Sequence, residues 1–326
     1  MKILVTGSTG FIGKHLVKRL LSNGHEVRCL IRETSVKPVE FINSVEWYIG
    51  NFADPYTLTP ALKGVDAVIH LAGCIKAKKK SDYYSINYYG TKNLVDAMQK
   101  ACKEGTKLIY VSSQSAAGPS SSPGVPQREN DPAYPISAYG DSKLAGEIAV
   151  SKARNRFNVV IIRPAIVYGP GDRETLLFFK YARKHIRPVI GFKERYISMV
   201  HISDFVKMVL LTLDKKIESG EVFFVSDGKI YTTRELFKLI SKLMSTWIVP
   251  VPIPLTFVCI AALLNNAMGY LSGKVTMLNI DKYKELKALY WICSSEKAAK
   301  EGFSPDYDLK KGLQETYQWY IENGWL

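Results

Sequence analysis

The chain has 326 residues, of which 47% are hydrophobic, and its formal net charge at pH 7 is +14. A chain of this length and composition can bury a large core, so we expect one large domain or two coupled ones. The positive charge favours acidic partners such as phosphate-bearing cofactors or an anionic membrane surface. Because no recognised nucleic-acid-binding motif is present, we expect no nucleic-acid partner.

The cysteines and the N-terminus point to an intracellular protein. Five cysteines are scattered without a CxxC pair or a metal-binding spacing, so we expect thiols in a reducing compartment and no metal site. The N-terminus enters an apolar strand pattern at once, which argues against a signal peptide. We therefore expect a cytoplasmic protein, with membrane association as an open alternative. The cysteines stand at positions 29, 74, 102, 259 and 293.

Strand and helix patterns alternate along the first half of the chain. This alternation predicts an α/β fold with a parallel sheet covered on both faces. A further helix at 203–214 and a strand at 221–227 extend it. Strands are expected at 2–7, 25–32, 45–54, 65–73, 107–113 and 158–169, and helices at 11–22, 82–101 and around Tyr139.

The pattern loosens beyond residue 170, which suggests two parts. We expect a dinucleotide-binding domain at 1–170, with a return at 201–228. Residues 171–200 and 229–326 then form a smaller cap over the carboxyl ends of the strands, where open parallel sheets bind their ligands. A loop rich in Ser, Pro and Gly at 118–135 is the longest and precedes Tyr139, and such loops often border a site.

The first chemical motif is "GSTGFIG", in which Gly7, Gly10 and Gly13 lie between the first strand and its helix. Glycine lets the backbone turn sharply and approach a pyrophosphate, whose charge the helix N-terminus stabilises. A glycine triplet is weak evidence alone, because turns and tight packing also use glycine. Its place directly after an N-terminal strand makes it strong.

The second motif is "YGDSK", which sets Tyr139 and Lys143 one helical turn apart. Taken alone, this pair is more often a solvated helix face than a site. A free tyrosine has a pKa of about 10, too high for a base at neutral pH. A lysine one turn away favours the phenolate through its charge.

Together these motifs resemble the extended short-chain dehydrogenase/reductase superfamily, the NAD-dependent epimerase/dehydratase group. The pattern is most similar to the branch of 3β-hydroxysteroid dehydrogenases and dihydroflavonol reductases. The resemblance implies a Rossmann-type doubly wound parallel sheet with a smaller, mixed C-terminal substrate-binding cap. It is carried by "TGSTGFIG", "HLAG" at 70–73, "NYYGTKNL" at 87–94, "YVSSQSAAG" at 110–118, "YGDSK" at 139–143, "RPAIVYGPGDR" at 163–173 and "WYIENGWL" at the end.

The resemblance assigns a catalytic role to Ser113, Tyr139 and Lys143. Tyr139 is the expected acid/base, exchanging a proton with the substrate oxygen while hydride moves to or from the nicotinamide. Lys143 also holds the nicotinamide ribose in the family. Ser113 is expected to hydrogen-bond the reacting oxygen, with its neighbour Ser112 as the alternative. Asn87 matches a family position behind the active site, where we expect it to organise structure or a proton path.

The cofactor is expected to be NADP or NAD. Arg32, at the end of the second strand, falls where dihydroflavonol reductase-like members carry a phosphate-binding arginine, whereas the adjacent Glu33 keeps NAD open. Asp54 matches an aspartate that receives the adenine amino group, and its alternative is a turn residue before Pro55. The expected cofactor-binding set is Gly7, Thr9, Gly10, Phe11, Ile12, Gly13, Arg32, Phe52, Asp54, Leu71, Ala72, Gly73, Tyr139 and Lys143.

The expected substrate is a hydrophobic alcohol or ketone. Nucleotide-sugar enzymes of the family carry an asparagine where this chain has Ile166. They also carry a phosphate-binding arginine where it has Ile197, although Arg195 lies nearby and is a candidate substitute. Nucleotide-sugar epimerisation or dehydration with tightly bound NAD is the alternative. A nucleotide-binding regulator or a membrane-surface protein is a second one, and a homodimer is left open.

An uncharged apolar stretch at 243–273 belongs to the expected cap. Pro250, Pro252 and Pro254 interrupt it, so the remaining helix is short for a membrane span. We expect first a buried cap helix, then an apolar pocket wall or a peripheral membrane contact through 247–271, and last a span.

Overall fold

The computed structural model describes residues 1–272 and 278–326, and for residues 269–272 the backbone alone. The predicted stretch at 243–273 thus has its last residue outside the described part. In chain order, the elements up to the last strand of the first half are β1 Lys2–Thr6, α1 Phe11–Ser22, β2 Glu26–Ile31, η1 Val39–Phe41, β3 Glu46–Ile49, η2 Pro55–Leu58, α2 Thr59–Leu62, β4 Ala67–His70, α3 Lys80–Tyr84, η3 Ser85–Gly90, α4 Thr91–Ala101, β5 Lys107–Val111, α5 Gln114–Ala117, α6 Ala138–Ser151 and β6 Asn158–Pro164.

The second half contains shorter strands. Its elements are β7 Ile166–Tyr168, α7 Thr175–Arg183, β8 Ile186–Ile190, β9 Tyr196–Ile197, β10 Met199–His201, α8 Ile202–Asp214, β11 Glu221–Val225, β12 Tyr231–Thr232, α9 Thr233–Leu243, β13 Val249–Ile253, α10 Leu255–Ser272, α11 Ile280–Lys287, β14 Tyr290–Trp291, α12 Glu296–Lys300 and α13 Leu309–Glu322.

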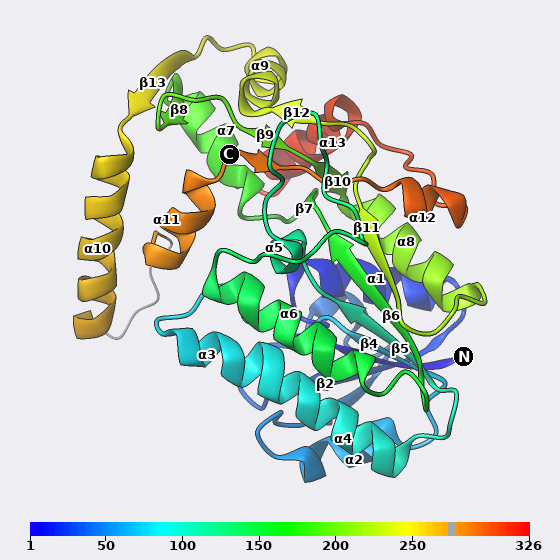
Figure 1. Ribbon diagram of the computed structural model, residues 1–326. Coiled ribbons are helices and arrows are strands. Elements are labelled where there is room, and N and C mark those ends of the chain that lie inside the picture. The colour runs from blue at the N-terminus through cyan, green and yellow to red at the C-terminus, as the bar shows by residue number, and fades with distance from the viewer. Residues whose placement is uncertain (273–277) are drawn as a thin grey trace. The chain divides into compact units, whose positions relative to one another are not determined.

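Seven strands form one central sheet in the order β11-β6-β5-β4-β1-β2-β3 (Figure 1). The neighbouring pairs from β6 to β3 are parallel, and Ile3 of β1 lies opposite both Val27 of β2 and Ala67 of β4. The order runs outward in both directions from β1 and β4, which makes the gap between their carboxyl ends the topological switch point. The predicted doubly wound parallel sheet is therefore confirmed.

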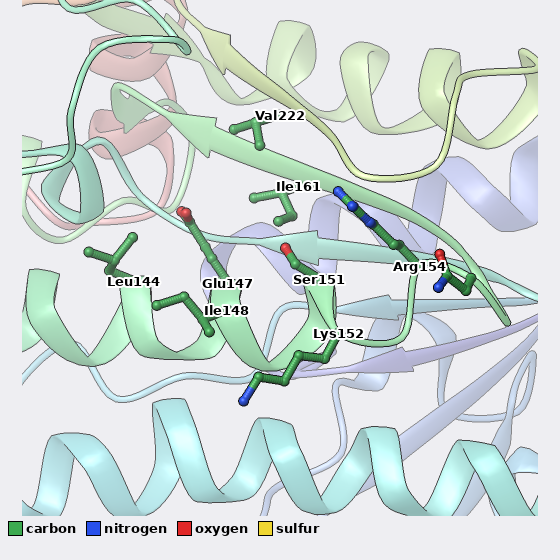
Figure 2. A pocket seen from close by; sticks show the side chains of 9 residues that line it. Leu144, Glu147, Ile148, Ser151, Lys152, Arg154, Ile161 and Val222 are labelled. Atoms are coloured by element: carbon green, nitrogen blue, oxygen red, sulfur yellow. The ribbon is translucent and has the colours of Figure 1, made fainter.

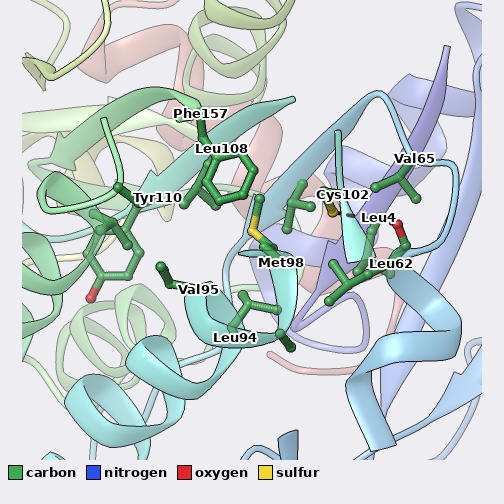
Figure 3. Packing of buried hydrophobic residues seen from close by; sticks show 14 of the residues in the cluster. Leu4, Leu62, Val65, Leu94, Val95, Met98, Cys102, Leu108, Tyr110 and Phe157 are labelled. Carbon is green, nitrogen blue, oxygen red and sulfur yellow. Dashed lines mark hydrogen bonds between the residues drawn. The ribbon is translucent and has the colours of Figure 1, made fainter. Parts of the chain in front are cut away.

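Alternating side chains of the strands pack on both faces of this sheet. One face carries a buried cluster in which Leu4 and Leu108 of the strands meet Leu94 and Met98 of α4 (Figure 3). Ile3, on the other side of β1, is fully buried as well. Burial of each such side chain stabilises the folded state by about 1.5–3 kcal/mol. These two layers hold the ends of β1, β4 and β5 in fixed register.

The chain divides into two compact units, which we describe separately. The first comprises residues 1–116, 139–163 and 206–223, and the second comprises 117–138, 164–205 and 224–326. The second unit has its own core, where Phe179 of α7 stacks on Tyr317 of α13 with ring centroids 5.6 Å apart. This unit includes the expected cap at 171–200 and 229–326, and it also takes in the loop before Tyr139. A substrate-binding role for it stays a prediction.

The structure corrects three local expectations. The apolar run at 158–169 is two strands, because the chain leaves the central sheet after Pro164 and β7 pairs with β10. The helix expected at 82–101 contains a π-helical turn, η3. Asp54 does not end a strand, since β3 ends at Ile49 and Asp54 instead caps η2 by accepting a hydrogen bond from the backbone N–H of Tyr56.

The apolar stretch is not the buried helix that we expected. Its main element, α10, exposes several large hydrophobic side chains, among them Phe257 and Met268. Within residues 1–272 and 278–326, no helix is long and apolar enough to cross a membrane.

Candidate active site

The glycine turn after β1 is built by three glycines with different steric surroundings. Gly7 has φ +73°, a left-handed conformation that favours glycine, and a Cβ there would lie 2.7 Å from the backbone nitrogen of Ala72. A Cβ on Gly13 would lie 2.2 Å from the carbonyl oxygen of Gly7. Both glycines are therefore required by the packing of the turn itself.

Gly10 differs, because its open side faces away from the protein. The nearest atom to a Cβ there would be the Gly7 oxygen at 3.4 Å, an ordinary contact, and Gly10 is exposed at the N-terminus of α1. No packing within the first unit demands a glycine at this position. The turn thus leaves an uncovered backbone at a helix N-terminus, which is where a pyrophosphate fits. Thr9, Phe11 and Ile12 of the same turn are partly buried.

Residues after β4 lie against this turn. The backbone N–H groups of Leu71 and Ala72 donate hydrogen bonds to the carbonyl and the hydroxyl oxygen of Thr6, each at 3.2 Å. A Cβ on Gly73 would lie 3.2 Å from Oδ1 of Asn87 and 3.8 Å from Nζ of Lys143. The switch point of the sheet therefore brings together the expected residues of the glycine turn, the end of β4 and helix α6.

Lys143 is buried beneath this surface. Its Nζ donates a hydrogen bond of 2.7 Å to the carbonyl of Val111 at the end of β5 and lies 4.3 Å from the ring centroid of Tyr110. Burial lowers the pKa of Lys143 to about 7, and the charge of Glu147 opposes that shift. The ammonium is consequently poised to lose its proton near neutral pH.

Tyr139 and Ser113 belong to the elements that Lys143 connects. Tyr139 is half-buried on α6, one turn before Lys143, and its ring centroid lies 6.2 Å from that of Tyr83. Ser113 follows β5, two residues beyond the carbonyl that Lys143 contacts. Its hydroxyl accepts a hydrogen bond of 3.1 Å from the N–H of Ser115, which leaves the hydroxyl proton able to donate elsewhere.

The two serines at the end of β5 differ in access. Ser112 is buried, and its Oγ has no hydrogen-bond partner among the described residues, whereas Ser113 is only partly buried. The next residue, Gln114, is also buried, with its Nε2 unpartnered within the same part of the chain. Ser113 therefore has the more accessible of the two hydroxyl groups.

Asn87 ties two parts of the site together. Its Oδ1 accepts a hydrogen bond of 2.7 Å from the N–H of Cys74, and its Nδ2 donates to the carbonyl of Cys74 and to the hydroxyl of Ser142. Asn87 sits in the π-helical turn η3, a feature frequent at functional sites. No local sequence signal marks this turn, because the contacts that stabilise it come from the loop after β4 and from α6.

His70 is a structural residue. It is buried between the hydroxyl groups of Thr6 and Thr91, with ring nitrogens 2.7 and 3.0 Å from them. Burial, assisted by the charge of Lys143, lowers the pKa of His70 to about 3. The imidazole is therefore neutral at physiological pH and does not serve as the acid here.

The outer cofactor candidates are exposed. Arg32 and Glu33 follow β2 directly, and both are exposed. The carboxylate of Asp54 caps η2, which is the turn role that the sequence also allowed. The ring of Phe52 lies 5.5 Å from that of His70, and its carbonyl accepts a hydrogen bond from Asn93.

A pocket of about 430 Å³ lies along α6, but none of the expected site residues lines it (Figure 2). Glu147 on its wall forms a buried two-point ion pair with Arg163, with N–O distances of 2.9 and 2.6 Å. The pocket is lined by Leu144, Glu147, Ile148, Ser151, Lys152, Arg154, Asn155, Ile161 and Val222.

Arg195, the candidate substitute for a phosphate-binding arginine, makes three hydrogen bonds within the second unit. Its guanidinium donates hydrogen bonds to the backbone carbonyls of Ile190 and Leu286. The neighbouring Ile197 is buried in the core of this unit, and Ile166 of β7 is half-exposed.

Comparison with known proteins identifies a matching family and several similar proteins. The model of the NAD dependent epimerase/dehydratase family matches residues 3–226. A ceramide reductase of Caulobacter vibrioides is 32% identical over 99% of this chain and 96% of its own length. A UDP-glucose 4-epimerase of Vibrio cholerae is 28% identical over 98% of this chain and 95% of its own. The solved structure of UDP-glucose 4-epimerase with UDP-glucose from Thermotoga maritima superposes with a TM-score of 0.79 at 25% identity, covering 99% of both chains.

Proposed function

Because the chain belongs to the NAD-dependent epimerase/dehydratase family, we propose that it reduces a ketone, or oxidises the matching alcohol, on a hydrophobic substrate. The family membership makes it an enzyme of the extended short-chain dehydrogenase/reductase type, as its sequence motifs suggested. The relatives include both a reductase and a nucleotide-sugar epimerase, so family membership alone does not define the substrate.

The residues of the first unit fit a nicotinamide dinucleotide. The uncovered Gly10 backbone at the start of α1 suits the pyrophosphate, and the small residues Ala72 and Gly73 suit its passage along the switch point. Lys143, 3.8 Å from the position of a Cβ on Gly73, would reach the nicotinamide ribose. When bound, the cofactor supplies the hydride for the carbonyl carbon.

Three side chains of this chain carry out and support the proton transfer. In the reductive direction the Tyr139 hydroxyl donates its proton to the carbonyl oxygen as the new C–H bond forms, giving the alcohol. The Ser113 hydroxyl donates a hydrogen bond to the same oxygen and orients it. Lys143, charged when protonated and one turn from Tyr139, stabilises the phenolate that remains.

We favour NADP(H) over NAD(H). Arg32 stands directly after β2 and is exposed, and a guanidinium there suits a 2′-phosphate. Glu33, beside it, is the residue that would instead favour a free ribose.

The observation that carries the hydrophobic substrate is the engagement of Arg195. Three of its five N–H groups are committed to the backbone carbonyls of Ile190 and Leu286, which disfavours a role in binding a sugar diphosphate. Ile197 and Ile166 cannot donate a hydrogen bond from their side chains. The extensive similarity to a ceramide reductase supports the same choice. We therefore propose a ketone or alcohol attached to a long acyl chain. Nucleotide-sugar epimerisation is the second candidate, favoured by the UDP-glucose 4-epimerase relatives.

The test follows the absorbance of the reduced nicotinamide for the ketone. For the sugar nucleotide it follows the chromatographic separation of UDP-glucose from its 4-epimer, because epimerisation returns the nicotinamide to its oxidised form at the end of each turnover. The protein is mixed with a long-chain acyl ketone in detergent micelles, with NADPH or NADH, and in parallel with UDP-glucose and NAD. We expect ketone-dependent oxidation of NADPH, with a KM for NADPH about tenfold below that for NADH. Conversion of UDP-glucose to its 4-epimer, without turnover of any ketone, would overturn the proposal.

Tyr139→Phe is the matched control for this assay. It keeps the ring but removes the proton, so turnover should fall by about two or more powers of ten while NADPH still binds. Near-normal turnover by this variant would contradict the acid/base role of Tyr139.

A further inference from the structure

Helix α10 carries its apolar side chains on the outside. It contains no charged residue over Leu255–Ser272 and, in Figure 1, it runs beside α11 at the border of the second unit. Five large hydrophobic residues are exposed: Phe257 is 65% exposed, Ile260 52%, Leu263 54%, Leu264 60% and Met268 62%. Apart from the adjacent pair Leu263 and Leu264, they recur every three or four positions. These five residues are called the α10 apolar face below.

The opposite side of α10 contains the smaller and more polar residues. Val258 and Ala262 are buried, while Asn265 and Asn266 are partly buried. A helix on the surface of a water-exposed protein shows the reverse pattern, with its large apolar residues facing the core. A contiguous apolar patch of this kind marks a surface that binds a membrane or another protein.

The exposed charged residues of the neighbouring helix are lysines. Helix α11 packs against α10 and exposes Lys282, Lys284 and Lys287. Its two acids are only partly exposed: Asp281 accepts a hydrogen bond from the N–H of Ala138, and Glu285 accepts one from the hydroxyl of Ser137 and pairs with Lys282. The exposed charges at the border of the apolar face are therefore those of lysines, chiefly Lys284 and Lys287.

Exposed aromatic and basic residues also lie near the start of α10. Trp247, just before β13, is exposed and stacks on His185 with centroids 4.1 Å apart. Gly191 abuts the side chain of Leu255, and the next residues, Phe192 and Lys193, are exposed. Trp and Phe beside Lys is the composition of segments that rest in the headgroup region of a bilayer.

We propose that the α10 apolar face docks the protein on an anionic lipid bilayer, with α10 lying in the plane of the interface. An 18-residue helix is about 27 Å long. The basic border complements anionic headgroups. A second copy of the chain fits less well, because a two-fold pairing through this face would bring the lysines of the two α11 helices close to one another.

The test is flotation of the whole protein with vesicles. One set contains phosphatidylcholine alone, and the other contains equal parts of phosphatidylcholine and phosphatidylglycerol. We expect the protein to float with the anionic set and to be released by high salt.

The double variant Phe257→Asp/Leu264→Asp should lower the bound fraction at least tenfold, and Lys284→Glu/Lys287→Glu should lower binding to the anionic set selectively. Val36→Asp, at an apolar site of the first unit that is even more exposed (86%), is the control and should float like the unchanged protein.

Folding and assembly are checked in the same preparations. All variants should keep the circular dichroism and melting temperature of the unchanged protein, because the replaced side chains face solvent. Failure of the unchanged protein to float, or undiminished flotation of Phe257→Asp/Leu264→Asp, would overturn the proposal. So would conversion of a dimer to a monomer by the same variant in light scattering, without vesicle binding, since a second copy would then cover the face.

Discussion

Lys143 connects the pH of the solution to the stability of the candidate site. Its ammonium is buried beside the aromatic ring of Tyr110, with the Val111 carbonyl as its hydrogen-bond acceptor, and its pKa is lowered to about 7 from an ordinary value of 10.5. A group held in this way is costly to protonate without a bound partner. The same position is one from which a charged group acts strongly on its neighbours.

This pKa predicts a defined pH dependence for the protein without cofactor. Between pH 7 and 10.5 the unfolded chain binds a proton at Lys143 that the folded chain lacks, so the contribution of Lys143 to the free energy of unfolding rises with pH in that window. Below about pH 7 both states are protonated, and the cost of burying the cation is fully present. Urea unfolding of the unchanged protein and of Lys143→Met measures this contribution, since methionine does not titrate.

The difference in unfolding free energy between the two proteins should change in favour of the unchanged protein by about 1.4 kcal/mol per pH unit between pH 7.5 and 9.5. A constant difference across this range would show that Lys143 keeps its charge when buried.

At the scale of elements, the structure of the turn between β1 and α1 predicts different effects for the same substitution at two glycines. Adding one methyl group at Gly13 places it 2.2 Å from the Gly7 oxygen, so Gly13→Ala should destabilise the first unit by about 3 kcal/mol. The same methyl at Gly10 meets only that oxygen at 3.4 Å, so Gly10→Ala should fold normally. It should nonetheless weaken dinucleotide binding about tenfold, or ~1.4 kcal/mol, because the methyl occupies the side that the pyrophosphate approaches.

Thermal unfolding and a fluorescence titration with NADPH separate the two effects. Unchanged affinity in a folded Gly10→Ala protein would mean that the pyrophosphate does not approach Gly10.

Most elements of the first half were predictable because their signals are local. The glycine turn, α1 and the strands β1, β2 and β4 each follow from apolar periodicity and from glycine placement within a few residues. The break between β6 and β7 was not predictable, since the apolar run continues through it. The break depends on distant partners: the Ala165 N–H donates to Val225, and β7 pairs with β10.

The same distinction between local and distant signals applies to the candidate site. The sequence motifs named Tyr139, Lys143 and Ser113, and the structure adds the burial of Lys143 and the greater access of Ser113 relative to Ser112. The π-helical turn around Asn87 was missed, and the outward apolar face of α10 corresponds to an alternative that was ranked below a buried helix. Hydropathy alone cannot distinguish a helix that faces a core from one that faces outward, because both need the same residue types.

At the scale of the whole molecule, the expected cofactor residues are concentrated in one unit. All of them, from Gly7 to Lys143, belong to residues 1–116 and 139–163. Each unit also has its own buried cluster, around Leu94 and Met98 in the first and around Phe179 and Tyr320 in the second. On the proposed assignment, the dinucleotide therefore stabilises the first unit directly.

This distribution predicts an uneven response to cofactor in hydrogen exchange. A ligand that binds only the folded state at a hundredfold excess over its Kd stabilises that state by about 2.7 kcal/mol, which slows exchange through unfolding about a hundredfold. With saturating NADPH, we expect this slowing in peptides that cover β1, the turn to Gly13 and the first two turns of α6. Peptides that cover α7, in the core of the second unit, should change little. Equal slowing in both sets would show that the units unfold as one body, and slowing confined to α7 would place the cofactor outside the first unit.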